Sequence, residues 1–328
     1  MGERLMGYAQ TDTIDIEDRY GELVRISGPG MYEQGYFLAP NSTGLLQDAP
    51  VKTLWQKSMF GMSYSGMEWE RREIVFTLGI GYDETGIDPE RDPDDWHQLY
   101  DDLRRKFHYD RDTKVIYGSG DGDRILYMRL IETPKPFSTF QFEGKDPRLF
   151  SFGSVMLTAA CEFPFYMGPS EKTVWEFGGT GTNWTRIPFF NPGDVPVWPT
   201  YEVTEGARYH IPDYSWGNEY FGRGVADEDK IVPTPFLRPG ETCDIHTRPD
   251  EETYQSANDA PIGLRAEGKD WEYPIPPGEG VGAEDPDEGA VFMATECVDG
   301  GVLTCEIPRW YSSPYARPRL TRPVYVSA

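Results

Sequence analysis

Basic residues, cysteine and long apolar runs are all scarce in this sequence, and each shortage excludes a class of function. Its 31 lysine and arginine residues are outnumbered by 55 acidic residues, so the net charge is −24 at pH 7. Nucleic-acid binding is driven by counter-ion release at clustered basic residues, so we expect no sequence-specific nucleic-acid binding. No apolar run approaches the roughly 18 residues of a membrane-spanning helix, and residues 1–13 lack the apolar core of a secretion signal. We expect a soluble chain without membrane insertion.

The cysteines are too few for a disulfide framework in a chain of this length, and they are Cys161, Cys243, Cys297 and Cys305. Cys297 and Cys305 flank a predicted hairpin turn at residues 299–301, but only a loop shifted to 300–302 sets them opposite each other, so we expect free thiols. Cys243 and His246 have the spacing of a metal-binding pair. A structural zinc ion needs four ligands, however, and the sequence has no second matching pair. We expect no metal and no cofactor.

Glycine, proline and aromatic residues are abundant instead. The chain has 35 glycines and 28 prolines, and 14% of its residues are aromatic. The glycine and proline content stays below the roughly 25–30% that suggests disorder, which favours an ordered, loop-rich β protein. At about 100 to 200 residues per domain, the length predicts two domains. A change in the strand pattern near residues 166–170 predicts domains at 1–166 and 167–328.

Alternating apolar residues predict strands in the N-terminal half. A hairpin is expected around a turn at Tyr20 and Gly21. The clearest strand is expected at residues 72–82, and the polar residues 66–72 are expected to belong to the same strand. The residues that define these strands are Ile14, Ile16, Val24, Ile26, Ile74, Phe76, Leu78 and Ile80.

Further along, a second hairpin is expected at residues 114–131 and another alternating strand at 154–163. The loop of this hairpin, residues 118–123, is rich in glycine. A phosphate-binding loop needs a helix after it, and here a strand follows, so we interpret the loop as a turn.

A single amphipathic helix is predicted at residues 92–107. Asp92 can cap its first N–H groups, and Pro93 suits the first helical position. Three basic residues, 104–106, complement the negative end of the helix dipole. Apolar residues follow helical spacing, which predicts that the helix packs on a sheet. They are Trp96, Leu99, Tyr100, Leu103 and Phe107.

Short strands alternate with turns in the C-terminal half, a rhythm typical of a β-sandwich. The strands are expected at residues 173–177, 185–190, 197–203, 208–211, 291–298 and 302–307. Residues 191–194 have turn chemistry, with a glycine free to take positive φ. Pro196 and Pro199 mark an edge strand or the start of a strand. The polar stretch 217–289 is expected to be dominated by loops.

Several of these segments together resemble the distal tail proteins and minor tail proteins of long-tailed bacteriophages, those of viruses of actinobacteria in particular. The N-terminal segments are 96–107, 124–130, 146–147 and 160–166. The C-terminal segments are 191–199, 200–203, 209–213, 255–258, 273–278 and 308–310. One departure lies at residues 310–314, where this family would have a basic residue before the proline.

The resemblance implies a structural protein of the virion tail tip, made in the host cytoplasm. It implies a hexameric ring that joins the tail tube to the tip or baseplate complex and lets DNA pass. Residues 1–166 would be the ring-forming β domain with one helix, and residues 167–328 a galectin-like or carbohydrate-module-like β-sandwich with long acidic loops. The implied partners are further copies of the chain, the tube protein, the tip hub, other minor tail proteins and the tape measure protein.

The rival hypothesis is a carbohydrate-binding or carbohydrate-active protein that recognises host cell-wall glycans. Its candidate stacking residues are Trp175, Trp184, Trp198, Trp216 and Trp271. A glycosidase needs two carboxylates at a defined separation, and none of the 55 acidic residues is singled out by the sequence. The sequence also has no Gly-x-Ser-x-Gly elbow. We therefore predict no enzyme, and no catalytic, cofactor-binding or metal site.

Overall fold

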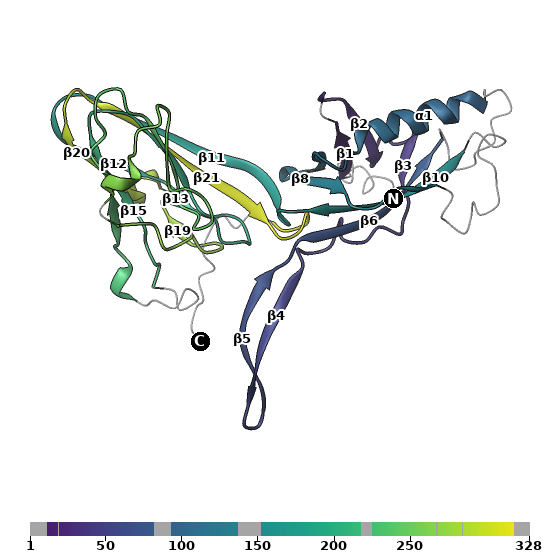
Figure 1. Cartoon of the computed structure of the whole chain (residues 1–328), viewed down its shortest axis with the longest axis horizontal. Coiled ribbons are helices and arrows are strands. Elements are labelled where there is room, and N and C mark those ends of the chain that lie inside the picture. Colours follow the sequence, from purple (N-terminus) through teal and green to yellow (C-terminus); the bar gives the residue numbers. More distant parts are fainter. Residues whose placement is uncertain are drawn as a thin grey trace, which may run out of the picture. The chain divides into compact units, whose positions relative to one another are not determined.

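The computed structural model describes residues 12–18, 20–81, 93–136, 152–217, 225–266, 268–283 and 285–317. These residues lie mainly in β-strands, with one α-helix among them, which confirms the predicted fold class. The chain divides into two compact units (Figure 1): unit 1 is Met1–Gly168 with Ser312–Tyr315, and unit 2 is Pro169–Tyr311 with Ala316–Ala328. The polypeptide passes from unit 1 into unit 2 along β11 (Tyr166–Phe177) and returns at the end of β21 (Gly301–Tyr311).

Two antiparallel hairpins form one layer of unit 1. Its strands pair in the order β2 (Leu23–Ser27), β1 (Thr13–Glu17), β7 (Thr113–Ser119) and β8 (Gly122–Leu130). Both predicted hairpins are confirmed. Their inward residues alternate along the strands and are buried, as a half-covered sheet requires: Ile14, Ile16, Val24, Ile26, Val115, Tyr117, Leu126 and Met128.

A second set of strands completes unit 1. It comprises β3 (Tyr36–Leu38), β6 (Arg72–Ile80), β10 (Gly153–Cys161) and the short β9 (Lys135–Pro136). β8 joins the two sets, because its last two residues pair with Ala159 and Ala160 of β10. The predicted apolar face of β6 is fully buried. The expectation that residues 66–72 form a single strand with β6 is wrong, because β6 begins at Arg72 and residues 61–69 belong to a separate hairpin.

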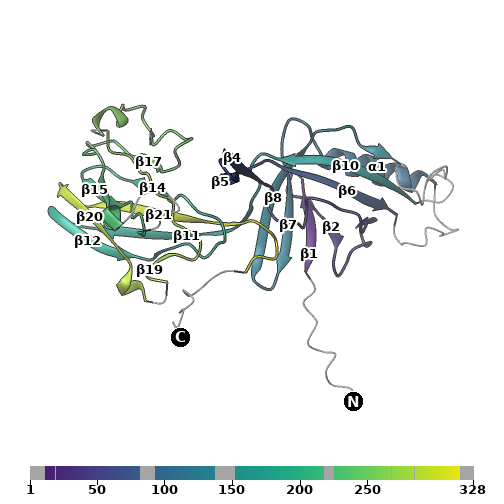
Figure 2. The ribbon, with the colours of Figure 1, turned by 90° about the horizontal axis from the view of Figure 1, so that it is seen from below.

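The predicted helix is present as α1 (Pro93–Lys106), alongside β6 and β10 (Figures 1 and 2). Trp96, Leu103 and Phe107 are buried, and the Phe107 ring lies 6.0 Å from that of Phe76 in β6. The proposed cap, Asp92, lies outside the described residues. No helix in the described part of the chain is long and apolar enough to span a membrane.

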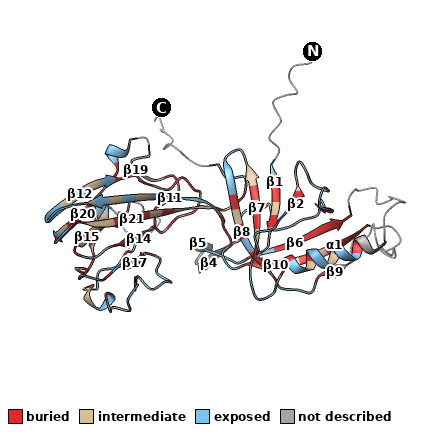
Figure 3. Cartoon of the chain, turned by 90° about the horizontal axis from the view of Figure 1, so that it is seen from above, coloured by how far each residue is buried: buried red, intermediate tan, exposed pale blue. Residues whose placement is uncertain are grey.

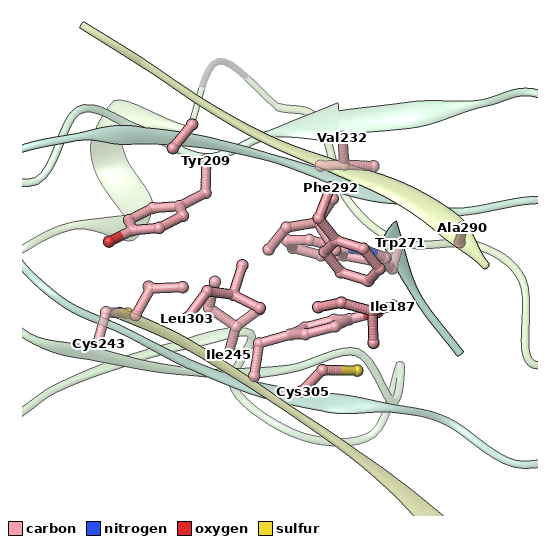
Figure 4. Packing of buried hydrophobic residues seen from close by; sticks show 14 of the residues in the cluster. Ile187, Tyr209, Val232, Cys243, Ile245, Trp271, Ala290, Phe292, Leu303 and Cys305 are labelled. Carbon is pink, nitrogen blue, oxygen red and sulfur yellow. The ribbon is translucent and has the colours of Figure 1, made fainter. Parts of the chain in front are cut away.

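Unit 2 is a β-sandwich. One sheet has the order β18 (Tyr254–Ser256), β17 (Cys243–His246), β14 (Thr200–Val203), β21 and β11. The other has the order β12 (Gly181–Ile187), β20 (Ala290–Cys297), β15 (Arg208–Pro212) and β16 (Ile231–Pro233). A short pair, β13 (Phe189–Phe190) and β19 (Gly280–Val281), lies beside them. Figure 4 shows how Phe292 of the second sheet and Leu303 of the first meet in a common core.

The stretch 217–289 contributes more structure than its polar composition indicates. It supplies the short strands β16, β17, β18 and β19 and buries Ile245, Trp271 and Ile275 in the core of unit 2, while loops make up most of its described residues, as expected. β17 pairs with β14 on the side opposite β21. Pro199, the residue before β14, therefore marks the start of a central strand and not an edge strand.

The turn predicted at residues 191–194 is confirmed, but its glycine is not required for a positive φ. Asn191 is buried, and its amide nitrogen donates to the carbonyl oxygens of Val195 and Ile275 at 2.8 and 3.0 Å. Gly193 does not take positive φ. A Cβ at this position would lie 2.3 Å from the carbonyl oxygen of Trp310, so glycine is required by lack of space.

The four cysteines are buried and free, as predicted. Cys297 ends β20 and Cys305 lies in β21, and these strands belong to opposite sheets of the sandwich. Residues 299–301 therefore connect two sheets and do not form the predicted hairpin turn. Burial raises the pKa of the Cys161 and Cys243 thiols to about 12.

We expect these thiols to be unreactive in the native protein. A thiolate is the reactive species, and a pKa raised from about 8.5 to about 12 lowers its fraction at pH 8 on the order of a thousandfold. An aromatic disulfide reagent at pH 8 should label native protein more than about a hundredfold more slowly than protein unfolded in guanidinium. One native thiol that reacts at the unfolded rate would contradict the buried placement of these residues.

Candidate functional site

A hollow in unit 1 carries no catalytic constellation. It has a volume of about 720 Å³ and is lined by Gly44, Gln47, Asp48, Pro50 and residues 70–73. Arg71 in this lining pairs with Glu73 at 2.6 Å. Among the lining residues there is no histidine, serine, cysteine or lysine, so the hollow holds no nucleophile with an adjacent base.

In unit 2, a smaller hollow of about 160 Å³ is lined by residues of β11, β14, β17 and β21. Cys243 and Ile245 of β17 point into the core, while Asp244 and His246 lie on the other face of the strand. Cys243 and His246 therefore point to opposite faces of the sheet and do not form a metal-binding pair. His246 Nδ1 instead lies 3.0 Å from a carboxylate oxygen of Glu251.

The five tryptophans of the carbohydrate hypothesis do not form a common exposed surface. Trp271 is only 6% exposed in the core of unit 2, and Trp175 and Trp216 pack against that core. Trp198 is half-buried. Trp184 on β12 is 66% exposed and is the one fully presented indole of the five. The structure therefore offers no stacked aromatic platform from this set.

The most unusual surface of the described residues is the hairpin of β4 (Val51–Ser58) and β5 (Gly61–Trp69). Its two strands pair only with each other, so both outer edges are unpaired. Figure 1 shows it projecting from the sheets of unit 1, and Figure 3 shows that little of it is buried. The register shifts by one residue between Leu54 and Trp55, which indicates a bulge.

Cross-strand pairing divides the side chains of this hairpin into two unlike faces. Neighbours such as Trp55 and Tyr64 lie directly opposite each other and therefore share a face, as do Gln56 and Ser63 on the reverse side. We call the first the apolar face, which consists of Val51, Thr53, Trp55, Lys57, Met62, Tyr64, Met67 and Trp69. We call the second the polar face, which consists of Lys52, Leu54, Gln56, Ser58, Gly61, Ser63, Gly66 and Glu68.

The base of the hairpin is held by a buried arginine. Arg72 follows β5 after two residues, and its guanidinium donates at 2.7–2.8 Å to the backbone carbonyl oxygens of Gly44, Gln47, Pro164 and Ser312. Burial lowers the pKa of this group. The hydrogen bonds of Arg72 to Gly44 and Gln47 join the segment before β4 to the start of β6. At the same end, the Trp69 ring packs edge-on against Phe165, with centroids 4.9 Å apart.

Sequence reasoning missed this surface, although its signals were present. Met62 and Tyr64 alternate with polar residues, as do Met67 and Trp69 after the register shift, and the two residues Met59 and Phe60 separate the strands. Because residues 66–72 are polar and precede the strand at 72–82, the sequence pattern assigned them to that strand. The solvent-exposed apolar face could not be told from a buried one by periodicity alone.

Sequence comparison finds relatives of this chain among phage proteins. No family model matches it. It is 28% identical over 353 residues to the minor tail protein Gp27 of Mycobacterium phage D29, in an alignment that covers 92% of this chain and 98% of that protein. It is 27% identical over 355 residues to the minor tail protein Gp27 of Mycobacterium phage L5, with the same coverage.

Among solved structures, the fold is similar to that of the Dit protein, gp 19.1, of phage SPP1. The TM-score is 0.53 at 13% identity, and the match covers 92% of this chain and 99% of that one. That protein is described as a paradigm of the hub adsorption apparatus of phages that infect Gram-positive bacteria. The sequence relatives cover nearly the whole chain, and the structural match covers both units. The chain is thus similar over nearly its whole length to minor tail proteins of two mycobacteriophages, and its fold is similar to that of the SPP1 Dit protein.

Proposed function

We propose that this protein is a distal tail protein without enzymatic activity. In this role it forms a hexameric ring at the tail tip, joins the tail tube to the tip or baseplate complex, and lets DNA pass. The observation that carries the proposal is the nearly full-length similarity to phage minor tail proteins, together with a distal-tail-protein fold. The unpaired apolar hairpin of unit 1 supports an assembling protein, because monomeric proteins rarely expose large apolar patches.

The charge of the chain suits passage of DNA. A channel that must release DNA should present few groups that bind phosphate, and each copy carries a net charge of −24 at pH 7. The same charge opposes assembly, since the copies repel one another. That repulsion is screened beyond about 8–10 Å near physiological ionic strength.

The two units have separate tasks in this proposal. Unit 1 makes the ring and contacts the tube protein, since it carries the exposed hairpin. Unit 2 lies outside the ring and contacts the tip hub and other minor tail proteins. Its tryptophans mostly serve its own core, which gives glycan binding little support.

Electron microscopy and sedimentation test this function. We expect the purified chain, alone or with its phage's tube protein, to form rings with a central hole, and we expect raised salt to favour them. Immunogold labelling of virions should place the protein at the tail tip. Labelling along the whole tail or on the head, or hydrolysis of host cell-wall polysaccharide by the chain, would contradict the proposal.

A further inference from the structure

The two outer faces of the sandwich in unit 2 differ in charge. On the sheet that contains β14 and β17, the residues that line the hollow of about 160 Å³ include three carboxylates and one lysine, Lys172. Two of these carboxylates, on Glu202 and Asp244, belong to residues directly opposite each other, where like charges repel. The outer face of the other sheet, formed by β12, β20, β15 and β16, has a different chemistry.

A row of cross-strand neighbours defines this second face: Trp184 of β12, Met293 of β20 and His210 of β15. Arg186 and Arg208 each lie two residues along a strand from a member of the row, so they lie on the same face. The Trp184 side chain is 66% exposed. Tryptophan, methionine and arginine are enriched in protein–protein interfaces, and tryptophan and arginine dominate their hot spots.

The second face is positive, although the chain has a net charge of −24. Arg208 pairs with the exposed Glu296 at 3.0 Å. Arg186 is exposed and, among the described residues, donates to the carbonyl oxygen of Gly289 at 3.2 Å, which leaves most of its five N–H donors for a ligand. The pKa of His210 is lowered by burial and by the positive charge of Arg208. An acidic partner complements this face.

β12 also has an unpaired edge. Among the described strands it pairs with β20 alone, so its other side carries backbone N–H and C=O groups that have no strand partner. Beyond the bulge between Gly181 and Asn183, residues 183–187 pair regularly with β20. A further strand can add to this extended segment, and its alternate side chains then lie beside Trp184 and Arg186.

We infer that an acidic, extended segment of another protein adds as a strand to the free edge of β12. Its carboxylates meet Arg186, and one of its apolar side chains covers Trp184. Backbone pairing supplies affinity, and the side chains on the second face supply specificity. The inference rests on the proposed function, in which unit 2 contacts other tail proteins, and it names the surface and the chemistry of that contact.

Peptides of defined charge test the inference on the full-length chain. In the first fluorescein-labelled peptide, threonine fills one face of the strand, and valine alternates with glutamate on the other. The second peptide has lysine in place of glutamate. By fluorescence anisotropy at physiological ionic strength, we expect the glutamate peptide to bind at least about 10-fold more tightly than the lysine peptide.

Three exposed side chains separate the local contact from the general field of the protein. Arg186→Glu should reverse the preference between the two peptides, and Trp184→Ala should weaken binding of the glutamate peptide about 10-fold or more. Lys172→Glu makes the same change of charge on the outer face of the other sheet and should alter binding less than about 2-fold. Circular dichroism verifies that the variants fold. Equal effects of Arg186→Glu and Lys172→Glu would overturn the inference.

Amide hydrogen exchange tests the addition of a strand. The glutamate peptide should slow exchange in β12 and leave β16, the other edge of the same sheet, unchanged. Protection at β16, or at neither edge, would overturn the inference. Binding of a uronic-acid oligosaccharide through Trp184 in place of the peptide would also overturn it and would assign the face to an acidic glycan. Weakened self-association in Arg186→Glu would assign it to a second copy, with the same consequence.

The failures of the two hypotheses can be told apart. If the glutamate peptide does not bind, yet immunogold labelling places the protein at the tail tip, the inference is overturned and the proposed function stands. If the peptide binds at β12, yet the label lies on the head or along the whole tail, the function is overturned and the binding surface stands.

Discussion

Replacement of Arg72 by methionine is expected to destabilise unit 1 by about 3–5 kcal/mol. The Arg72 side chain is fully buried, and its guanidinium is the donor for four backbone carbonyl oxygens from three separate parts of the chain. Methionine fills similar volume but donates no hydrogen bond, so these acceptors would lose their common donor. Relief of the desolvation of the buried charge offsets part of this loss.

Two controls make the result specific. Arg72→Lys keeps the charge but has one ammonium group in place of a planar fork, so it should recover less than half of the lost stability. Arg71→Met changes the neighbouring residue, whose exposed side chain pairs with Glu73, and should change stability by less than about 0.5 kcal/mol. Amide hydrogen exchange of β6 and β10 measures each effect within unit 1. Equal protection in Arg72→Met and Arg71→Met would show that the four contacts contribute little.

A fragment of residues 1–168 is expected to be much less stable than unit 1 in the whole chain. It contains every strand of unit 1 but lacks Ser312–Tyr315. Arg72 donates to the Ser312 carbonyl oxygen at 2.7 Å, and Arg124, also buried, donates to those of Ser313 and Pro314 at 3.3 and 3.1 Å. Each buried charged donor that loses its acceptor costs about 1–3 kcal/mol, so the fragment should lose several kcal/mol.

The matched control is a fragment in which residue 168 is joined to residues 311–317 by a short glycine–serine linker. β11 and β21 are neighbours in one sheet, which makes a short linker sufficient. We expect this fragment to unfold at a higher urea concentration than residues 1–168 alone. Identical urea midpoints would show that the returning segment adds no stability to unit 1.

Local patterns predicted the local structure well. The β1–β2 and β7–β8 hairpins, the apolar face of β6 and the buried side of α1 all follow from alternation, helical spacing and turn residues. These features depend on residues close together in the sequence. Burial of Trp96 and Leu103 on one side of α1 is the clearest case.

Features that depend on distant pairing were not predictable in the same way. Nothing local in residues 217–289 indicates that β17 pairs with β14, because that choice depends on the whole sandwich. A single arginine at the start of an apolar strand gives no sign that it is buried, since its acceptors include a carbonyl group 240 residues away. The exposure of the apolar face of β4–β5 was also not predictable. Its apolar pattern is that of a buried strand, and only the structure shows that it is exposed.

The double connection between the units has a mechanical consequence. β11 carries the chain out and β21 carries it back, and near the crossing Ser170 donates to Glu306 and Arg309 pairs with Glu171 across these two strands. A tensile force applied to unit 2 would therefore be divided between two polypeptide segments that are neighbours in one sheet. In domains joined by a single linker, one segment would carry the whole of such a force.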